Sequence, residues 1–252
     1  MNFLERKRFI LDLIDQNGSI YAKDLVEKLG ISEITIRRDF AELEKRGLIK
    51  RSHGGAMHPL LAKDPEPVSF KAKSTLNIED KIYICSLAAA HIVDGDVIYL
   101  DCGSTIFQIC QFIKNKKIKV ITNSIPILYE LLGSSVSLIL IGGEVDVERQ
   151  AAHGKTATEQ ISKYHAQKAF FSTDGISIGK GLTAKSEIES ETAMAMVSNA
   201  DKVFLLVDSS KIEKDSYLKI GPISIVDAII TDKNSNDNDL LKFKKIGIEI
   251  YK

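Results

Sequence analysis

The 252-residue sequence has little of what crosslinked or metal-stabilised domains use, with no tryptophan and only three cysteines. Cys85, Cys102 and Cys110 are an odd number and form no Cys-x-x-Cys pair, which argues against a disulfide framework and against a zinc site. His53 and His165 have no partner at the spacing of a metal site. We therefore expect neither a bound metal nor a cofactor.

Long apolar runs are absent too. No stretch approaches the roughly 18 residues that a membrane-spanning helix needs. The charged N-terminus is not followed by the apolar segment of a signal peptide. We therefore expect a cytoplasmic protein with no membrane partner.

Neither sign of charge is in excess, because 34 Lys and Arg balance 34 Asp and Glu. Zero net charge argues at first against a nucleic-acid partner. The charges are unevenly distributed, however, since residues 1–58 hold 11 basic and 9 acidic side chains and the rest of the chain holds 23 and 25. The case for nucleic acid therefore depends on where individual cations lie.

The prolines indicate how the chain is divided. Three of the five, Pro59, Pro65 and Pro67, fall in one short segment, where they block helix formation and hold the preceding residues extended. We expect a linker over residues 59–74, between a small domain of residues 1–58 and a larger domain of residues 75–252.

The small domain has the pattern of a helix-turn-helix over about residues 20–39. A helix over residues 22–29 ends at Gly30, and a helix over residues 33–46 follows Ser32, a typical N-cap residue. In the second of these helices Ile36, Phe40 and Leu43 recur at helical spacing and should pack inward. Two helices joined by a short turn containing glycine form the helix-turn-helix motif.

Polar and basic residues lie on the parts of this motif that could meet DNA. The first turns of the second helix reach base edges in the major groove, and the segment after Gly47 predicts a short basic wing that contacts phosphates. The alternatives are that the paired arginines only solvate an exposed helix, or that the domain binds protein. The candidate DNA-binding residues are Ser32, Thr35, Arg37, Arg38, Lys50, Arg51 and His53.

In the larger domain, short β-rich runs alternate with helical ones, which predicts an α/β fold with a mostly parallel sheet. Strands are expected at residues 97–100, 119–122, 137–141, 169–171, 203–207 and 228–231. Ligands of such sheets bind outside the carboxyl ends of the strands. Small, hydroxyl and charged residues follow these strands, although turns and helix caps need the same residue types.

The loop after the first expected strand suits a phosphate. Gly103 allows backbone N–H groups to approach an anion, Ser104 and Thr105 add hydroxyls, and a helix N-terminus follows. Lys211 could supply a countercharge, whereas Asp101 and Asp174 are acceptors suited to sugar hydroxyls.

The chain resembles the DeoR family of bacterial transcription regulators along almost its whole length. The resemblance rests on Ile31-Ser32-Glu33-Ile34-Thr35-Ile36-Arg37-Arg38-Asp39-Phe40 and Arg51-x-His53-Gly54-Gly55-Ala56, and later on Asp101-x-Gly103-Ser104-Thr105 and Asp208-Ser209-Ser210-Lys211. It implies a winged helix-turn-helix followed by a sensor domain with the fold of ribose-5-phosphate isomerase, which binds phosphorylated sugars. The effector residues expected on this basis are Asp101, Gly103, Ser104, Thr105, Asn123, Ser124, Gly142, Gly143, Asp174, Gly175, Glu189 and Lys211.

The function expected is that of a DNA-binding transcription regulator, a repressor of a carbohydrate-metabolism operon that is controlled by a phosphorylated sugar. It would be no enzyme, and it would bind operator DNA as a homo-oligomer, a dimer or tetramer, because such motifs read paired half-sites. The alternative is a sugar-phosphate isomerase with a DNA-binding appendage, in which Glu189 acts as the general base and Lys211 stabilises an enediolate.

Overall fold

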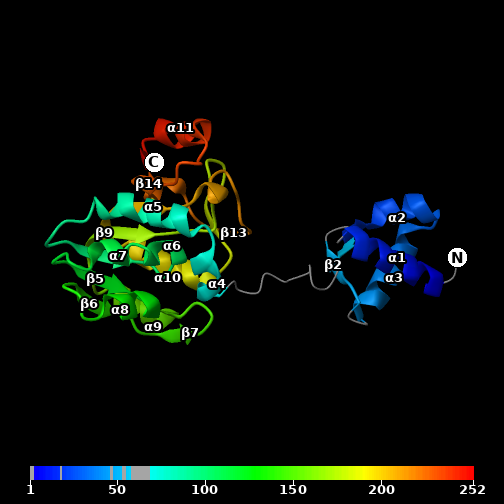
Figure 1. The fold of residues 1–252 in the computed structure, drawn as a ribbon, viewed down its shortest axis with the longest axis horizontal. Helices are drawn as coiled ribbons and strands as arrows, with labels where there is room; N and C mark the ends of the chain where they lie inside the picture. The colour runs from blue at the N-terminus through cyan, green and yellow to red at the C-terminus, as the bar shows by residue number, and fades with distance from the viewer. Residues whose placement is uncertain (1–2, 18, 46–47, 53–54, 58–68) are drawn as a thin grey trace. The chain divides into compact units, whose positions relative to one another are not determined.

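The computed structural model describes residues 3–17, 19–45, 48–52, 55–57 and 69–252. The chain forms two compact units, Met1–Glu66 and Pro67–Lys252, and each is described by itself (Figure 1).

The described residues of the first unit form three helices and a small antiparallel sheet. The helices are α1 (Phe3–Asn17), α2 (Ala22–Leu29) and α3 (Glu33–Lys45), and the strands β1 (Ser19–Tyr21), β2 (Lys50–Ser52) and β3 (Gly55–Met57) pair in the order β1-β3-β2. Helix α2 ends at Gly30, whose φ of 66° lies in the left-handed region that glycine adopts easily. Ser32 accepts a hydrogen bond from the Thr35 N–H and so begins α3 as expected.

The core of this unit confirms the predicted inward face of α3. Ile36, Phe40 and Leu43 are buried with residues of α1 and α2, among them Ile10 and Leu25. Strands β2 and β3 pair antiparallel after α3, where the sequence predicts a short basic wing, and β3 is additional. The fold of the first unit is thus a helix-turn-helix followed by a β-wing.

The second unit is built on seven strands that are all parallel. They are β4 (Val97–Leu100), β5 (Lys119–Thr122), β6 (Ser137–Leu140), β9 (Ala166–Phe171), β12 (Ala200–Leu206), β14 (Ala228–Ile230) and β15 (Glu249–Tyr251). Their order is β15-β14-β12-β9-β4-β5-β6. The six predicted strands are confirmed within a few residues at their ends, and β15 is additional.

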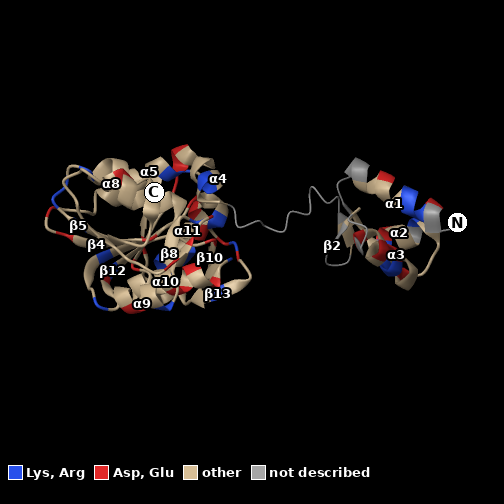
Figure 2. Ribbon diagram, turned by 90° about the horizontal axis from the view of Figure 1, so that it is seen from below, with Lys and Arg blue, Asp and Glu red and all other residues tan. Residues whose placement is uncertain are grey.

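Helices cover both faces of this sheet (Figure 2). One face packs against α5 (Ile78–Ala89), α6 (Ser104–Phe107), α7 (Cys110–Ile113) and α8 (Ile125–Leu131), and the other against α9 (Lys155–Ile161), α10 (Glu187–Val197) and α11 (Asp237–Lys245). The central strands are buried on both sides, so they read as nearly continuous apolar runs, such as Val203-Phe204-Leu205-Leu206.

Smaller elements complete the unit. β7 (Glu144–Asp146) pairs with β8 (Ala151–His153), and β10 (Gly175–Ser177), β11 (Gly181–Ala184) and β13 (Leu218–Gly221) form a second antiparallel sheet. Two short 3₁₀ turns occupy Ser209–Lys211 and Ile223–Ile225.

The segment expected as a linker is only partly described. Helix α4 occupies Phe70–Thr75, so residues 70–74 of that segment are helical. Ser69 caps α4 by accepting a hydrogen bond from the Ala72 N–H, which accounts for a helix starting soon after the prolines.

Candidate functional site

A pocket opens at the point where the strand order of the large sheet reverses. From β4 the chain adds β5 and β6 on one side, then continues with β9, β12, β14 and β15 on the other. The carboxyl ends of the neighbours β4 and β9 therefore separate into loops that leave in opposite directions, which is where ligands bind in open parallel sheets. The switch-point pocket is lined by Phe70, Lys73, Asp101, Cys102, Gly103, Ser104, Thr105, Arg149, Ser172, Thr173, Asp174, Ala184, Ser186, Glu189, Ser190, Ala193, Lys211 and Ile220.

One wall of the pocket is the loop after β4. Asp101 is buried, and its carboxylate accepts hydrogen bonds from the backbone N–H groups of Cys102 and Ser172. Burial raises the pKa of Asp101, and the charge of Glu189 adds to this shift. Gly103 packs closely, because a Cβ there would lie 3.3 Å from Asp101 Oδ2.

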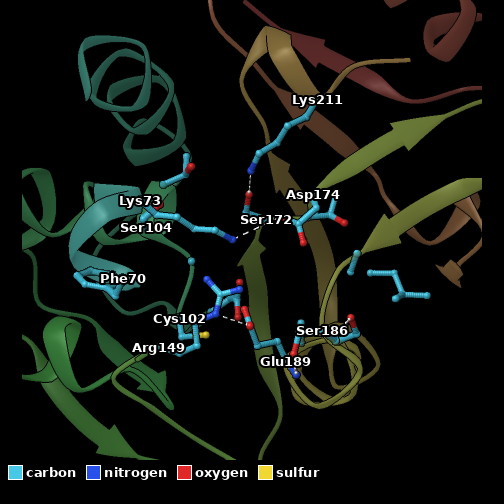
Figure 3. A pocket seen from close by; sticks show the side chains of 18 residues that line it. Phe70, Lys73, Cys102, Ser104, Arg149, Ser172, Asp174, Ser186, Glu189 and Lys211 are labelled. Carbon is cyan, nitrogen blue, oxygen red and sulfur yellow. Dashed lines mark hydrogen bonds and ion pairs between the residues drawn. The ribbon is translucent and has the colours of Figure 1, made fainter. Parts of the chain in front are cut away.

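Two lysines enter the pocket from different sides, and both point toward Ser172 and Asp174, which follow β9 (Figure 3). Lys73 Nζ lies 3.4 Å from Asp174 Oδ1, and Lys211 Nζ donates to Ser172 Oγ at 3.3 Å. Burial raises the pKa of Asp174, but the charges of Lys73, Lys211 and Lys185 and the hydrogen bond from the Lys185 N–H outweigh it and leave that pKa below its ordinary value. The carboxylate is therefore ionised and pairs with Lys73 in the pocket.

A third lysine lies behind the loop that follows β4. Lys81 is buried, and its Nζ donates to Ser104 Oγ at 3.2 Å and to the Lys73 carbonyl. Burial, reinforced by the charge of Lys211, lowers the pKa of Lys81 to about 8. Burial also lowers the pKa of Lys211.

A second charged pair lies beside Cys102, on another side of the pocket (Figure 3). Arg149 Nε and Glu189 Oε1 are 2.6 Å apart. Glu189 is held in place because Ser186 caps α10 by accepting a hydrogen bond from the Glu189 N–H. The pocket thus combines a cluster of lysines and serines with a separate set of carboxylates and a guanidinium.

Of the twelve expected effector residues, seven line this pocket. They are Asp101, Gly103, Ser104, Thr105, Asp174, Glu189 and Lys211.

The other five expected residues are not part of its lining. Asn123 is buried and donates to the Ala152 carbonyl, while Ser124 caps α8. The Gly142 N–H already donates to Gln160 Oε1, and a Cβ on Gly143 or Gly175 would lie 2.4 Å from a backbone carbonyl oxygen. Asn123, Ser124, Gly142 and Gly143 follow β5 or β6 and so lie away from the reversal between β4 and β9. Gly175 begins β10 next to Asp174, where it allows close backbone packing.

Several residues that line the pocket are not among the twelve expected effector residues. Ser172 and Thr173 follow a predicted strand directly and could have been found by the rule that picked Asp174. Lys73 and Arg149 had no such signal, since Lys73 lies in the expected linker and Arg149 in the turn before β8.

The expected DNA-binding residues are grouped on α3 and the wing. Ser32 Oγ and Thr35 Oγ1 are 2.9 Å apart at the start of α3, and Arg38 is exposed. Arg37 is exposed but pairs with Glu33 Oε1 at 2.7 Å, so the helix surface carries both signs of charge (Figure 2). Lys50 and Arg51 lie on β2, and His53 lies outside the described residues.

Each of the two units matches a known domain family. Residues 6–59 match the DeoR-like helix-turn-helix domain, and residues 76–233 match the DeoR C terminal sensor domain. The chain belongs to the DeoR family.

Named relatives in the family match over nearly the whole chain. The lactose phosphotransferase system repressor of Staphylococcus epidermidis is 33% identical over 98% of this chain and 97% of the relative. The repressor of the same name from Streptococcus mutans is 33% identical over 92% of this chain and 93% of the relative. As a DeoR-family protein, the chain is a DNA-binding transcription regulator.

Solved structures with a similar fold are more distant. The sorbitol operon regulator SorC from Klebsiella pneumoniae has a TM-score of 0.43 at 12% identity and covers 96% of this chain and 99% of that chain. Ribose 5-phosphate isomerase A from Methanocaldococcus jannaschii has a TM-score of 0.41 at 19% identity and covers 55% of this chain and 56% of that chain.

The described residues contain neither a membrane-spanning helix nor a cluster of metal ligands. Among those residues no helix is both long and apolar enough to span a membrane. The same part of the chain contains no group of three or more His, Cys, Asp or Glu side chains that could hold a metal ion.

Proposed function

We propose that this DeoR-family regulator represses an operon for the use of a carbohydrate, and that a phosphorylated sugar bound in the switch-point pocket releases it from its operator. The observation that carries the proposal is the pairing of two chemistries in one pocket. The ammonium groups of Lys73 and Lys211 with the Ser104 and Ser172 hydroxyls suit a phosphate. Asp101 and Glu189 suit sugar hydroxyls.

The relatives support the repressor role. Those from Staphylococcus epidermidis and Streptococcus mutans are named as repressors of a lactose phosphotransferase system. A sugar that is phosphorylated on uptake fits a pocket with an anion-binding part and a hydroxyl-binding part. Lactose or a product of it is therefore the first candidate for the parent sugar.

Release from DNA follows from a two-state equilibrium. A sugar phosphate that binds more tightly to the arrangement unable to bind DNA lowers operator affinity, and operator DNA must lower sugar-phosphate affinity by the same factor. Two or more copies of the chain bind each operator, because helix-turn-helix proteins read paired half-sites. The α3 helices supply the base contacts.

The test measures binding of the full chain to DNA from upstream of its own gene, with fluorescence anisotropy as the readout. Phosphorylated hexoses and pentoses should lower the affinity at least fivefold, whereas the unphosphorylated parent sugars should leave it unchanged. Arg38→Ala serves as the binding-deficient control. Equal affinity for this DNA and for a scrambled fragment would rule out the regulator function at this site.

The isomerase alternative is weakened by the position of Glu189. A general base must be available to the substrate carbon, but the Glu189 carboxylate lies in an ion pair with Arg149 at 2.6 Å. Turnover of ribose 5-phosphate that disappears in Glu189→Gln would restore the alternative.

A further inference from the structure

Helix α4 brings a lysine into the switch-point pocket from the segment that joins the two units. It is the first described helix after residues 58–68, which connect the second unit to the DNA-binding unit. The Phe70 N–H donates to the Glu148 carbonyl at 2.8 Å, and the Phe70 ring packs edge-on against Phe107 with centroids 5.5 Å apart. The start of α4 is therefore anchored to the wall of the pocket.

Contact between the C-terminal half of α4 and the pocket depends on charge. Lys73 forms an ion pair with Asp174, and the Lys73 carbonyl accepts from Lys81 Nζ. The separation of 3.4 Å between Lys73 Nζ and Asp174 Oδ1 is longer than the roughly 2.7–2.9 Å of a strong charge-assisted hydrogen bond. Both side chains are partly exposed, at 29% and 21%, so a ligand in the pocket can reach them.

The electrostatic surroundings of Lys73 favour an added anion. Burial is the main cause of the lowered pKa values of Lys81 and Lys211, and the charge of Lys73 lowers both further. Asp174 faces both Lys73 and Lys211, and Asp208 faces Lys211 and Lys81. A phosphate beside Ser104 and Ser172 would carry up to two negative charges and would offer Lys73 a stronger partner than one carboxylate.

We propose that the phosphate of the effector takes Lys73 from Asp174, and that this exchange of partners moves α4 and so transmits effector binding to the DNA-binding unit. The inference rests on the proposed function and adds the residue that couples the two sites. Lys73 then has two separable roles, as a ligand of the phosphate and as the connection to α4. Without a ligand, the Lys73–Asp174 pair holds α4 in the arrangement that permits operator binding.

The first test measures coupling in the full chain, using Lys73→Met and, as a matched control, Lys71→Met, which removes an exposed lysine from the same helix outside the pocket lining. Operator affinity is measured without ligand and at saturating inorganic phosphate or hexose 6-phosphate, with saturation checked by calorimetry. The wild type and Lys71→Met should lose operator affinity at least fivefold on saturation. Lys73→Met should bind the ligand more weakly and, once saturated, change operator affinity less than twofold. Full coupling in saturated Lys73→Met overturns the inference.

The second test needs no ligand and therefore separates the two proposals. Asp174→Asn removes the charge that holds Lys73, so amide hydrogen exchange of residues 70–75 should become faster than in the wild type. Exchange in α11, which contributes no residue to the pocket lining, should stay unchanged. If no phosphate compound affects the wild type, the proposed effector is wrong, but faster exchange in α4 still supports the role of the ion pair. Unchanged exchange in α4 overturns the inference whatever the effector.

Discussion

Arg149 Nε and Glu189 Oε1 lie 2.6 Å apart, although Arg149 precedes β8 and Glu189 lies in the first turn of α10. The Arg149 side chain is 9% exposed and that of Glu189 26% exposed, so this ion pair is screened less than a surface pair. It joins the β7–β8 region to α10 beside the pocket.

Glu189→Gln should therefore destabilise the second unit, because it leaves a buried guanidinium without its carboxylate. We expect a loss of roughly 1.5–3 kcal/mol in the free energy of unfolding, measured by urea denaturation followed by far-UV circular dichroism. Glu187→Gln, at an exposed position of the same helix turn, should change it by less than about 0.5 kcal/mol. Equal stability of the two variants would contradict a structural role for the pair.

Arg37→Ala and Arg38→Ala should weaken recognition of the operator more than binding to unrelated DNA. Each base-contacting arginine provides about 1–3 kcal/mol of discrimination, which is roughly a tenfold to hundredfold change in the ratio of the two affinities. Arg8→Ala, which removes an exposed cation from α1, is the matched control. A similar loss of operator discrimination in Arg8→Ala would show that overall charge, and not base contact by Arg37 and Arg38, determines DNA binding.

Glu33→Gln should strengthen DNA binding. Glu33 Oε1 neutralises Arg37 at 2.7 Å on an exposed helix turn, and removal of an anion there raises the local positive potential toward phosphates. The gain should be largest at low salt, measured by anisotropy over a salt series. Weaker binding at every salt concentration would mean that Glu33 itself contacts DNA or orients Arg37.

Asp39→Asn should destabilise the first unit. Arg6 donates to both Asp39 oxygens, at 2.6 and 3.0 Å, and Asp39 is 4% exposed, so the pair fastens α1 to α3 in a poorly screened place. Loss of one partner of a buried pair costs about 3 kcal/mol. Hydrogen exchange of α1 and α3 amides in the full chain should become faster, while Asp24→Asn, at an exposed position of α2, should have no effect.

Lys81 should make the stability of the ligand-free protein depend on pH. Burial lowers its pKa from 10.5 to about 8, so between these values the unfolded chain keeps a proton that the folded chain has released. Stability contributed at this site therefore rises as pH increases from 8 toward 10.5.

The measurement is the difference in unfolding free energy between the wild type and Lys81→Met from pH 7 to 10. Taking this difference cancels the contributions of titratable groups far from Lys81. It should grow in favour of the wild type above pH 8. A flat or falling difference would contradict the lowered pKa.

Much of the fold could be predicted because it depends on local patterns. The helical spacing of Ile36, Phe40 and Leu43, the cap at Ser32 and the left-handed stop at Gly30 are each determined by a few neighbouring residues. The buried strands are visible as apolar runs. Strand β15 is not, because Glu249 is exposed and the strand has only three residues at the edge of the sheet.

The candidate site was predictable only in part. The rule that ligands bind at carboxyl ends of strands selects every loop at that edge, including those with Asn123 and Gly142. Choosing among the loops requires the order of the strands, which depends on pairings between distant segments. That order puts the ends of β4 and β9 together and leaves β5 and β6 to one side.

By itself the sequence determined the family, the two kinds of fold and the position of the arginines on α3, because motifs, caps and apolar periodicity are local properties. Only the tertiary structure decided which polar residues share one pocket, since Lys73, Asp174 and Lys211 come together through packing between segments far apart in the chain. It also decided the electrostatic surroundings of the pocket. Burial and neighbouring charges shift the pKa values of Lys81, Asp174 and Lys211, and neither can be read from a residue and its sequence neighbours.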